Sequence, residues 1–244
     1  MTLSLFQKRF TFLYVIIALV DLSAVLLQDM FPYLRFFTKP LIMISLLVIY
    51  LISLWKFQIK ATIPMIVAII FSLLGDVFLL FKGDIAFMLG LGSFLIAHLG
   101  YIAVFMKDQK MTQYEKGPVL RRRPGLIVPF GLYTIILLVL LWSDLGALKI
   151  PVVIYSLTIM MMGLTALNRW RYVPLVSFGW VMTGALLFII SDSFIAINKF
   201  LMDFPLSGFW IMLTYIVAQY CLIMGITIQY EQWAISQQKE SVSS

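Results

Sequence analysis

The sequence contains few charged residues, one cysteine and one histidine, and each scarcity excludes a class of protein. Charged side chains make up 12% of its 244 residues, against roughly 25% in soluble domains. Hydrophobic residues make up 62% and the mean hydropathy is +1.02, so a water-soluble fold of this length could not bury its apolar surface. Cys221 and His98 stand alone, which excludes a disulfide framework and a Cys/His metal centre. The composition predicts an integral membrane protein.

Apolar runs long enough to cross a bilayer, about 17–25 residues each, recur along the chain. We expect a single transmembrane domain over residues 1–244, an all-α bundle of about eight helices. The run at 40–55 is short and begins at Pro40, a favourable first-turn residue. The first run follows Lys8 and Arg9 as a signal peptide would, but it is long and has no cleavage site, so we expect it to be retained. The expected helices lie near 10–27, 40–55, 61–81, 85–106, 125–142, 149–167, 174–197 and 209–228.

The net charge of +7 indicates orientation rather than a nucleic-acid partner. The amino end, the even-numbered connections and the carboxyl tail hold 13 Lys and Arg residues, and the odd-numbered connections hold 5. Because cytoplasmic loops are enriched in these residues, we expect both termini in the cytoplasm. The host membrane would be the cell membrane in a bacterium and an endomembrane in a eukaryote. The Arg121–Arg123 run fits a topology determinant better than a docking patch for acidic lipids.

Two similar segments suggest an internal duplication. Gly75-Asp76-Val77-Phe78 in the third run corresponds to Ser191-Asp192-Ser193-Phe194 in the seventh, 116 residues later. An offset of four helices preserves orientation, so the pattern predicts a parallel 4+4 repeat. Chance similarity is the alternative, because only a few residues match.

Polar side chains in the apolar runs are the candidate functional residues. Asp76 and Asp192 both fall about 8 Å below the outer ends of their helices, at 1.5 Å per residue. We expect both carboxyl groups to line one pocket in the outer half of the bundle. The neighbouring helices would add four polar side chains to this pocket, His98 near the midplane with Tyr101 on its helix face, Tyr215 in the outer third, and Gln219 between His98 and Tyr215. The pocket's mouth would carry a cationic rim of Lys39, Lys82 and Lys199.

Each of these residues also has a purely structural interpretation. The aspartates could be interhelical hydrogen-bond partners, and His98 and the tyrosines could be packing residues with a tethered polar atom. The lysines could mark helix ends by extending their amino groups to the interface. Asp21 and Asp144 look interfacial, and we do not include them in the site.

The chemistry available to such a pocket is narrow. The sequence has no metal-ligand cluster, no phosphate-binding glycine loop and no glycines that would position a nucleophilic serine. Two carboxyl groups in a medium of low dielectric constant can divide their roles, one protonated and the other ionised. That pair can protonate a substrate and stabilise the resulting cation, or carry a proton through a transporter. The residues alone leave both alternatives open.

Several motifs together resemble a known family. The seventh run contains Gly184 to Asp192 followed by Ala196-Ile197-Asn198-Lys199-Phe200, which resembles the signature of the lysoplasmalogenase family, the YhhN-like multi-pass membrane proteins. Shorter matches occur in order along most of the chain: Lys39-Pro40, Gly75-Asp76, Ala97-His98 with Tyr101, and Tyr215 with Ala218-Gln219.

The resemblance implies a hydrolase that cleaves the vinyl ether bond of lysoplasmalogens, single-chain phospholipids, to a fatty aldehyde and a glycerophospho-ethanolamine or -choline. It implies no metal or organic cofactor. Asp76 and Asp192 would then be catalytic, and the supporting or substrate-binding residues would be Lys39, His98, Tyr101, Ser191, Asn198, Lys199, Tyr215 and Gln219. A proton-coupled transporter or lipid-binding membrane protein that uses the same aspartates is the alternative. The sequence makes no prediction about the oligomeric state.

Overall fold

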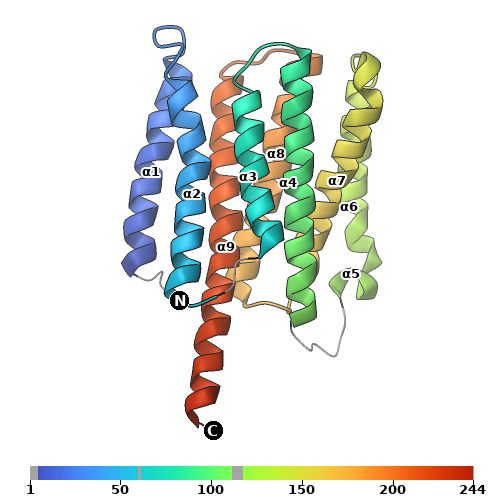
Figure 1. The fold of residues 1–244 in the computed structure, drawn as a ribbon. Coiled ribbons are helices and arrows are strands. Elements are labelled where there is room, and N and C mark those ends of the chain that lie inside the picture. The colour runs from blue at the N-terminus through green and yellow to red at the C-terminus, as the bar shows by residue number, and fades with distance from the viewer. Residues whose placement is uncertain (1–4, 60–61, 112–117, 244) are drawn as a thin grey trace.

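The computed structural model describes residues 5–59, 62–111 and 118–243, and within these ranges it contains helices and no strand (Figure 1). The all-α prediction is therefore confirmed. Residue 61, where the expected third span begins, and residues 112–117 of the expected fourth loop lie outside the described ranges. The helices are α1 (Leu5–Leu26), α2 (Arg35–Lys56), α3 (Ile63–Phe78), α4 (Asp84–Met111), α5 (Val119–Arg122), α6 (Ile127–Leu141), α7 (Lys149–Asn168), α8 (Leu175–Ala196) and α9 (Ser207–Ser243), with short turns η1 (Pro124–Leu126), η2 (Gly146–Leu148) and the π-helical η3 (Ile197–Leu201).

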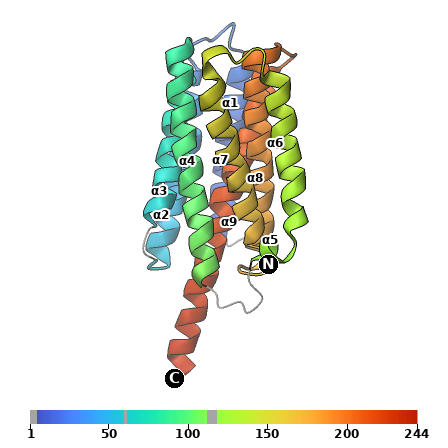
Figure 2. The same cartoon turned by 90° about the vertical axis from the view of Figure 1, so that its right-hand side faces the viewer.

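Seven helices in the described ranges are long and apolar enough to cross a membrane, and α3 is a shorter apolar helix of 16 residues. The protein is thus a multi-pass integral membrane bundle, as predicted. The first turn of α1 and the last turn of α9 lie at the same end of the bundle (Figures 1 and 2). The opposite end, called the far end below, carries the α1–α2, α3–α4, α6–α7 and α8–α9 connections.

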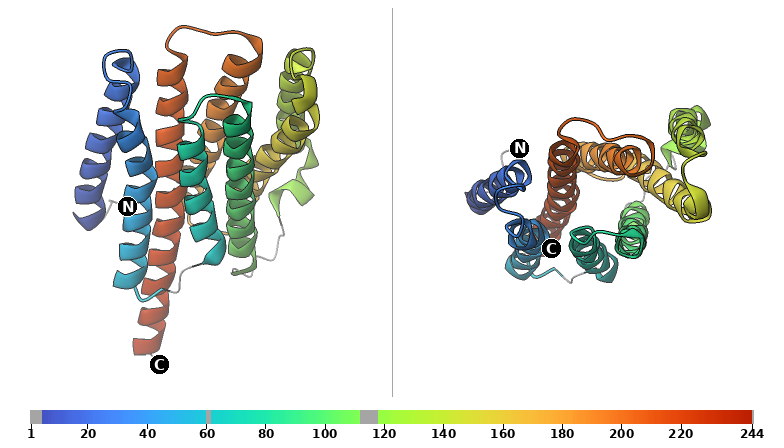
Figure 3. Two further views of the ribbon diagram at one scale, coloured as in Figure 1. Left: turned by 45° about the horizontal axis from the view of Figure 1, so that its top comes forward. Right: turned by 90° about the horizontal axis from the view of Figure 1, so that it is seen from above.

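Six of the helices form a closed ring. Going round it, α2 packs against α3, α3 against α4, α4 against α7, α7 against α8, α8 against α9, and α9 back against α2. Viewed from above, this ring is plain in Figure 3. Helix α1 packs outside it on α2 and α9, and α6 packs outside it on α7. The ring places side chains of helices distant in sequence opposite one another.

Glycines allow the closest helix contacts in the ring. A Cβ atom added to Gly100 of α4 would lie 2.7 Å from the carbonyl oxygen of Pro64 in α3. A Cβ atom added to Gly184 of α8 would lie 2.8 Å from the carbonyl oxygen of Ala218 in α9. Small residues at such positions let backbones approach closely in membrane bundles. The pairs α3–α4 and α8–α9 carry the two aspartates of interest, so this packing fixes their positions.

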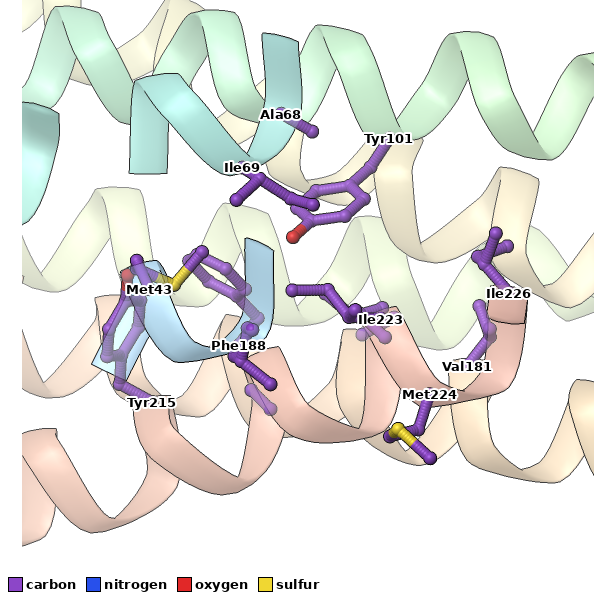
Figure 4. Packing of buried hydrophobic residues seen from close by; sticks show 14 of the residues in the cluster. Met43, Ala68, Ile69, Tyr101, Val181, Phe188, Tyr215, Ile223, Met224 and Ile226 are labelled. Atoms are coloured by element: carbon purple, nitrogen blue, oxygen red, sulfur yellow. The ribbon is translucent and has the colours of Figure 1, made fainter. Parts of the chain in front are cut away.

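The core fills the middle of the ring. Figure 4 shows Met43 of α2, Ala68 of α3, Tyr101 of α4, Val181 of α8 and Ile223 of α9 in this core. All five side chains are completely buried. The polar residues described below lie among these apolar side chains, with little access to solvent.

Two expectations about the first helices were wrong. Helix α2 begins at Arg35, so Pro40 lies within the helix rather than at its first turn. Asp21 is not interfacial: it is 0% exposed, and Thr38 Oγ1 donates a hydrogen bond of 2.6 Å to its Oδ1. The reason is the same in both cases. Thr38 and Lys39, near the start of α2, pair with Asp21 and Asp76 inside the bundle. The helix therefore extends further than its apolar residues alone indicate.

Candidate functional site

Asp192 lies near the far end of α8 with two aromatic neighbours. Tyr155 of α7 donates a hydrogen bond to its Oδ2. His98 of α4 places Nε2 3.8 Å from the same oxygen, too far for a hydrogen bond. Both contacts fall on Oδ2, and the side chain of Asp192 is 9% exposed. The carboxyl group is therefore held on one oxygen.

His98 is a buried imidazole with unused hydrogen-bonding capacity. It is 0% exposed, and neither ring nitrogen has a hydrogen-bond partner among the described residues. Its ring meets Tyr155 and Phe188 edge-on, at centroid distances of 5.4 and 4.7 Å. His98 does not line the pocket described next. An unpaired polar group in the interior is costly, so a water molecule bonded to one of these nitrogens would relieve that cost.

A pocket of about 360 Å³ opens between α4, α6, α7 and α8, and Asp192 is part of its wall. Its other polar lining residues include Tyr133, Tyr155 and Ser193, and the rest is mainly apolar. On α8 the lining extends from Ala196 to Leu186, a length of about 15 Å at 1.5 Å per residue. The shape and lining suit an alkyl chain with one polar group at the level of the carboxylate.

Asp76 occupies a different environment on α3. Its Oδ1 lies 3.5 Å from Nζ of Lys39, and Tyr215 donates a hydrogen bond of 2.7 Å to its Oδ2. The side chains of Lys39 and Asp76 are 6% and 1% exposed. Asp76 is not among the residues that line the pocket. The arrangement therefore differs from the expected single pocket with both carboxyl groups in its wall.

Aromatic rings lie between the two carboxyl groups. Tyr215, which bonds Asp76, meets Phe94 and Phe188 edge-on at centroid distances of 5.8 and 5.6 Å. Phe188 in turn contacts His98, which lies next to Asp192. The rings keep the buried ion pair of Asp76 out of the pocket while joining the two regions through direct contacts.

The remaining interior polar residues form a third group. Tyr101 donates a hydrogen bond of 2.6 Å to Oε1 of Gln219, and Nε2 of Gln219 donates one of 3.0 Å to Ser72. His98 and Tyr101 were expected to face one pocket, but His98 lies beside Asp192 whereas Tyr101 bonds Gln219. The Tyr101–Gln219–Ser72 group joins α4, α9 and α3 across the inside of the ring.

The three lysines do not form one rim. Lys39 is buried beside Asp76, whereas Lys82 and Lys199 are exposed. Lys199 Nζ lies 2.9 Å from Oδ1 of Asp84, and this pair links η3 to the start of α4 at the far end. The paired charge of Lys39 explains its position, because a buried ammonium group needs an anionic partner.

The two other expected site residues flank Asp192 in sequence. Ser191 donates a hydrogen bond of 3.0 Å to the carbonyl oxygen of Ile211, so it joins α8 to α9. Asn198 lies in the π-helical turn η3, and its buried Oδ1 has no hydrogen-bond partner among the described residues. π-helical turns often occur at functional sites. Among the described residues, no group of three or more His, Cys, Asp or Glu side chains could hold a metal ion.

Sequence reasoning missed several residues of these groups. Tyr155 and Ser72 were not considered, although Ser72 lies one helical turn before Asp76 and so shares its face. Tyr155 stands beside Ser156 in an apolar run, a polar pair that could have attracted notice. Its partner on another helix, however, could not be read from the sequence.

Comparison with known proteins supports one family. The sequence profile of the YhhN family matches residues 34–226, well over half of the chain. The chain belongs to the YhhN family. The matched range includes the residues of the Asp76, Asp192 and Tyr101–Gln219–Ser72 groups, from Lys39 in α2 to Gln219 in α9. No solved structure matches the chain.

Curated relatives of the chain carry a common name. The chain is similar to human lysoplasmalogenase TMEM86A, with 34% identity over 63% of this chain and 60% of that protein. It is also similar to bovine lysoplasmalogenase TMEM86A, with 30% identity over 65% of this chain and 63% of that protein. A lysoplasmalogenase of Mycobacterium bovis is 34% identical over 48% of this chain and 42% of that protein. The alignments thus span less than two thirds of the relatives' own length.

Proposed function

We propose that this protein hydrolyses the vinyl ether bond of lysoplasmalogens in the membrane. The names of the human, bovine and mycobacterial relatives support this activity. The observation that carries the proposal is the pocket, a mainly apolar space whose wall contains Asp192. A single-chain lipid fits such a space with its alkyl chain among the apolar residues and its ether bond at the carboxyl group.

In this reaction Asp192 acts as the general acid. Its Oδ2 receives the contacts from Tyr155 and His98, so Oδ1 is the oxygen that carries the proton. Transfer of this proton to the β-carbon of the vinyl ether gives an oxocarbenium ion, and the carboxylate left behind stabilises that cation. Tyr155 stabilises the carboxylate in turn, because its hydroxyl group donates to Oδ2.

Water completes the reaction. It adds to the oxocarbenium carbon and loses a proton, which returns to Asp192, and the resulting hemiacetal separates into a fatty aldehyde and the glycerol hydroxyl group. Nε2 of His98 is unpaired and lies 3.8 Å from Oδ2 of Asp192, so a water molecule that enters between them can bridge the two groups. Overall, one vinyl ether and one water give one aldehyde and one alcohol.

Asp76 has a supporting role in this proposal. Paired with Lys39 and bonded by Tyr215, it keeps a charged network behind the aromatic rings that form one side of the Asp192 site. The charge count of the connections supports an orientation with both termini in the cytoplasm. The lipid would then enter from the outer leaflet, and its phosphate would lie near Lys82 and Lys199 at the far end.

The test is fatty-aldehyde release from an alkenyl lysophospholipid by the purified protein in detergent. We expect Asp192→Asn to lower kcat/KM by about a thousandfold, in the range that positioned acid catalysts contribute. Asp203→Asn is the matched control, because Asp203 is an exposed carboxylate near the far end, and it should leave the rate unchanged.

Two results would overturn the proposed activity, and a third would exclude its mechanism. If the folded parent protein releases no aldehyde from either ethanolamine or choline lipids, lysoplasmalogens are excluded as its substrate. Proton flux across vesicles driven by a lipid gradient, without cleavage, would favour the transporter alternative. Full activity in a folded Asp192→Asn variant would instead exclude the mechanism.

A further inference from the structure

Two hydroxyl groups cross the side of the pocket between α6 and α8. Tyr133 donates a hydrogen bond of 2.8 Å to Oγ of Ser193, and Ser193 donates one of 2.7 Å to the carbonyl oxygen of Ile189. Both side chains line the pocket. Ser193 directly follows Asp192 in α8, so the two hydroxyl groups lie close to the depth of the proposed general acid.

Tyr133 also faces the outside of the bundle. It is 43% exposed although it is part of the pocket wall. Its helix stands outside the ring, and only 11% of the span that contains α6 is buried, the lowest share among the seven long spans. Tyr133 is therefore accessible both from the pocket and from outside the bundle, and its hydroxyl group links α6 to α8 through Ser193.

The geometry of the proposed substrate places a specific group at this position. In a lysoplasmalogen the ether oxygen is on the first glycerol carbon, and a free hydroxyl group is on the second. Three bonds separate these two oxygens, so they lie within about 3.6 Å of each other. A lipid with its vinyl ether at Asp192 therefore presents its second glycerol carbon to the residues next to Asp192.

We propose that Tyr133 and Ser193 recognise the free hydroxyl group on the second glycerol carbon and so restrict the pocket to phospholipids with one chain. This inference rests on the proposed hydrolase function. The Tyr133 oxygen donates to Ser193 and keeps lone pairs that can accept a hydrogen bond from the substrate. An ester at the same carbon has no hydrogen to donate, and its acyl chain would meet the Tyr133 ring.

The preference for the single-chain lipid over the two-chain lipid should be strong, because only the former can donate a hydrogen bond to Tyr133. A site built to bond a substrate hydroxyl rejects analogues that lack it far better than an apolar site rejects an extra group. With the two-chain lipid, the Tyr133 oxygen would keep its hydrogen bond to Ser193 but receive none from the substrate, and the ring would also have to move. Tyr133 is thus a specificity-determining residue, distinct from the acid that it lies beside.

The experiment compares aldehyde release from an alkenyl lysophosphoethanolamine and from its 2-acyl counterpart. We expect Tyr133→Phe, which keeps the ring, to lower kcat/KM for the single-chain lipid about tenfold, as loss of one substrate hydrogen bond implies. We expect Tyr133→Ala, which opens the side, to reduce the preference for the single-chain lipid by at least about tenfold. Ile136→Ala is the matched control: Ile136 is exposed on α6 and does not line the pocket.

A binding measurement separates this inference from the proposed function. Thermal stabilisation of the protein by saturated lysophosphatidylethanolamine and by its diacyl counterpart requires no cleavable bond. If the parent cleaves neither lipid but is stabilised by the single-chain lipid alone, and Tyr133→Ala abolishes that difference, the hydroxyl recognition stands and the hydrolase function fails. If cleavage is normal and both variants keep the parent's preference, the hydrolase stands and this inference is wrong.

Discussion

The two intramembrane aspartates occupy similar positions in their helices but have opposite surroundings. Asp76 is enclosed, with Lys39 and Tyr215 in contact with its two oxygens. Asp192 has its contacts on one oxygen and a pocket beside it. The comparison shows that burial of a carboxylate in a membrane is not enough to indicate chemistry. What distinguishes the candidate acid is access to a space that a substrate can occupy.

The partners of the two aspartates are exchanged between the helix pairs. His98, in the helix that follows Asp76, lies beside Asp192, and Tyr215, in the helix that follows Asp192, bonds Asp76. Such an exchange is what a two-fold arrangement of the α3–α4 and α8–α9 pairs would give. The proposed 4+4 repeat remains a prediction, and this reciprocal pairing is the feature that a comparison of related sequences should test.

The largest expected difference between the two regions is in stability. Asp76→Asn leaves the buried ammonium group of Lys39 without its anionic partner, and we expect a loss of about 3 kcal/mol in the free energy of unfolding. Replacing both residues, as Lys39→Met with Asp76→Leu, should recover most of this loss. Asp192→Asn should cost less than about 1 kcal/mol, because no buried cation depends on Asp192.

Equilibrium unfolding in detergent with a double-mutant cycle measures these differences. Equal losses for Asp76→Asn and Asp192→Asn would contradict the distinction between a structural and a catalytic carboxylate.

A smaller effect should separate the two tyrosines that bond the aspartates. Tyr155→Phe removes the donor that stabilises the carboxylate of Asp192 after proton transfer, so kcat/KM for aldehyde release should fall about tenfold, or about 1.4 kcal/mol. Tyr215→Phe removes the equivalent bond to Asp76 and should mainly lower the melting temperature. The two variants are each other's control, and interchanged phenotypes would assign the catalytic role to Asp76.

The smallest effect should come from the third polar group. Tyr101→Phe removes the hydrogen bond to Gln219, and interhelical hydrogen bonds in membrane bundles average about 0.6 kcal/mol. We expect a loss of this size in unfolding free energy and an unchanged kcat/KM. A large loss of activity at full stability would mean that the Tyr101–Gln219–Ser72 group extends the site across the ring.

The sequence was sufficient to predict the helices and the buried aspartates because both depend on local composition. A long apolar run specifies a spanning helix, and an acid within it is conspicuous. It was not sufficient to predict which side chains meet. Residues three apart, such as His98 and Tyr101, differ by about 60° around a helix, and in a closed ring that angle is enough to direct them toward different neighbours.

The errors have a related cause. Lys39 was expected at the mouth of the pocket and Asp21 at the interface, where charged side chains need no buried partner. Each has its partner on another helix, Asp76 for Lys39 and Thr38 for Asp21, and hydropathy along the chain contains no information on such pairs.

The position of α6 outside the ring has a consequence for biogenesis. Its span has a mean hydropathy of 2.3, the highest of the seven, and only 11% of it is buried. It can therefore leave the translocation channel and enter lipid alone. Helix α3 is only about 24 Å long at 1.5 Å per residue and contains Asp76, so we expect it to enter together with α4 as a hairpin. The α6 side of the pocket would then be in the bilayer independently of the six-helix ring against which it packs.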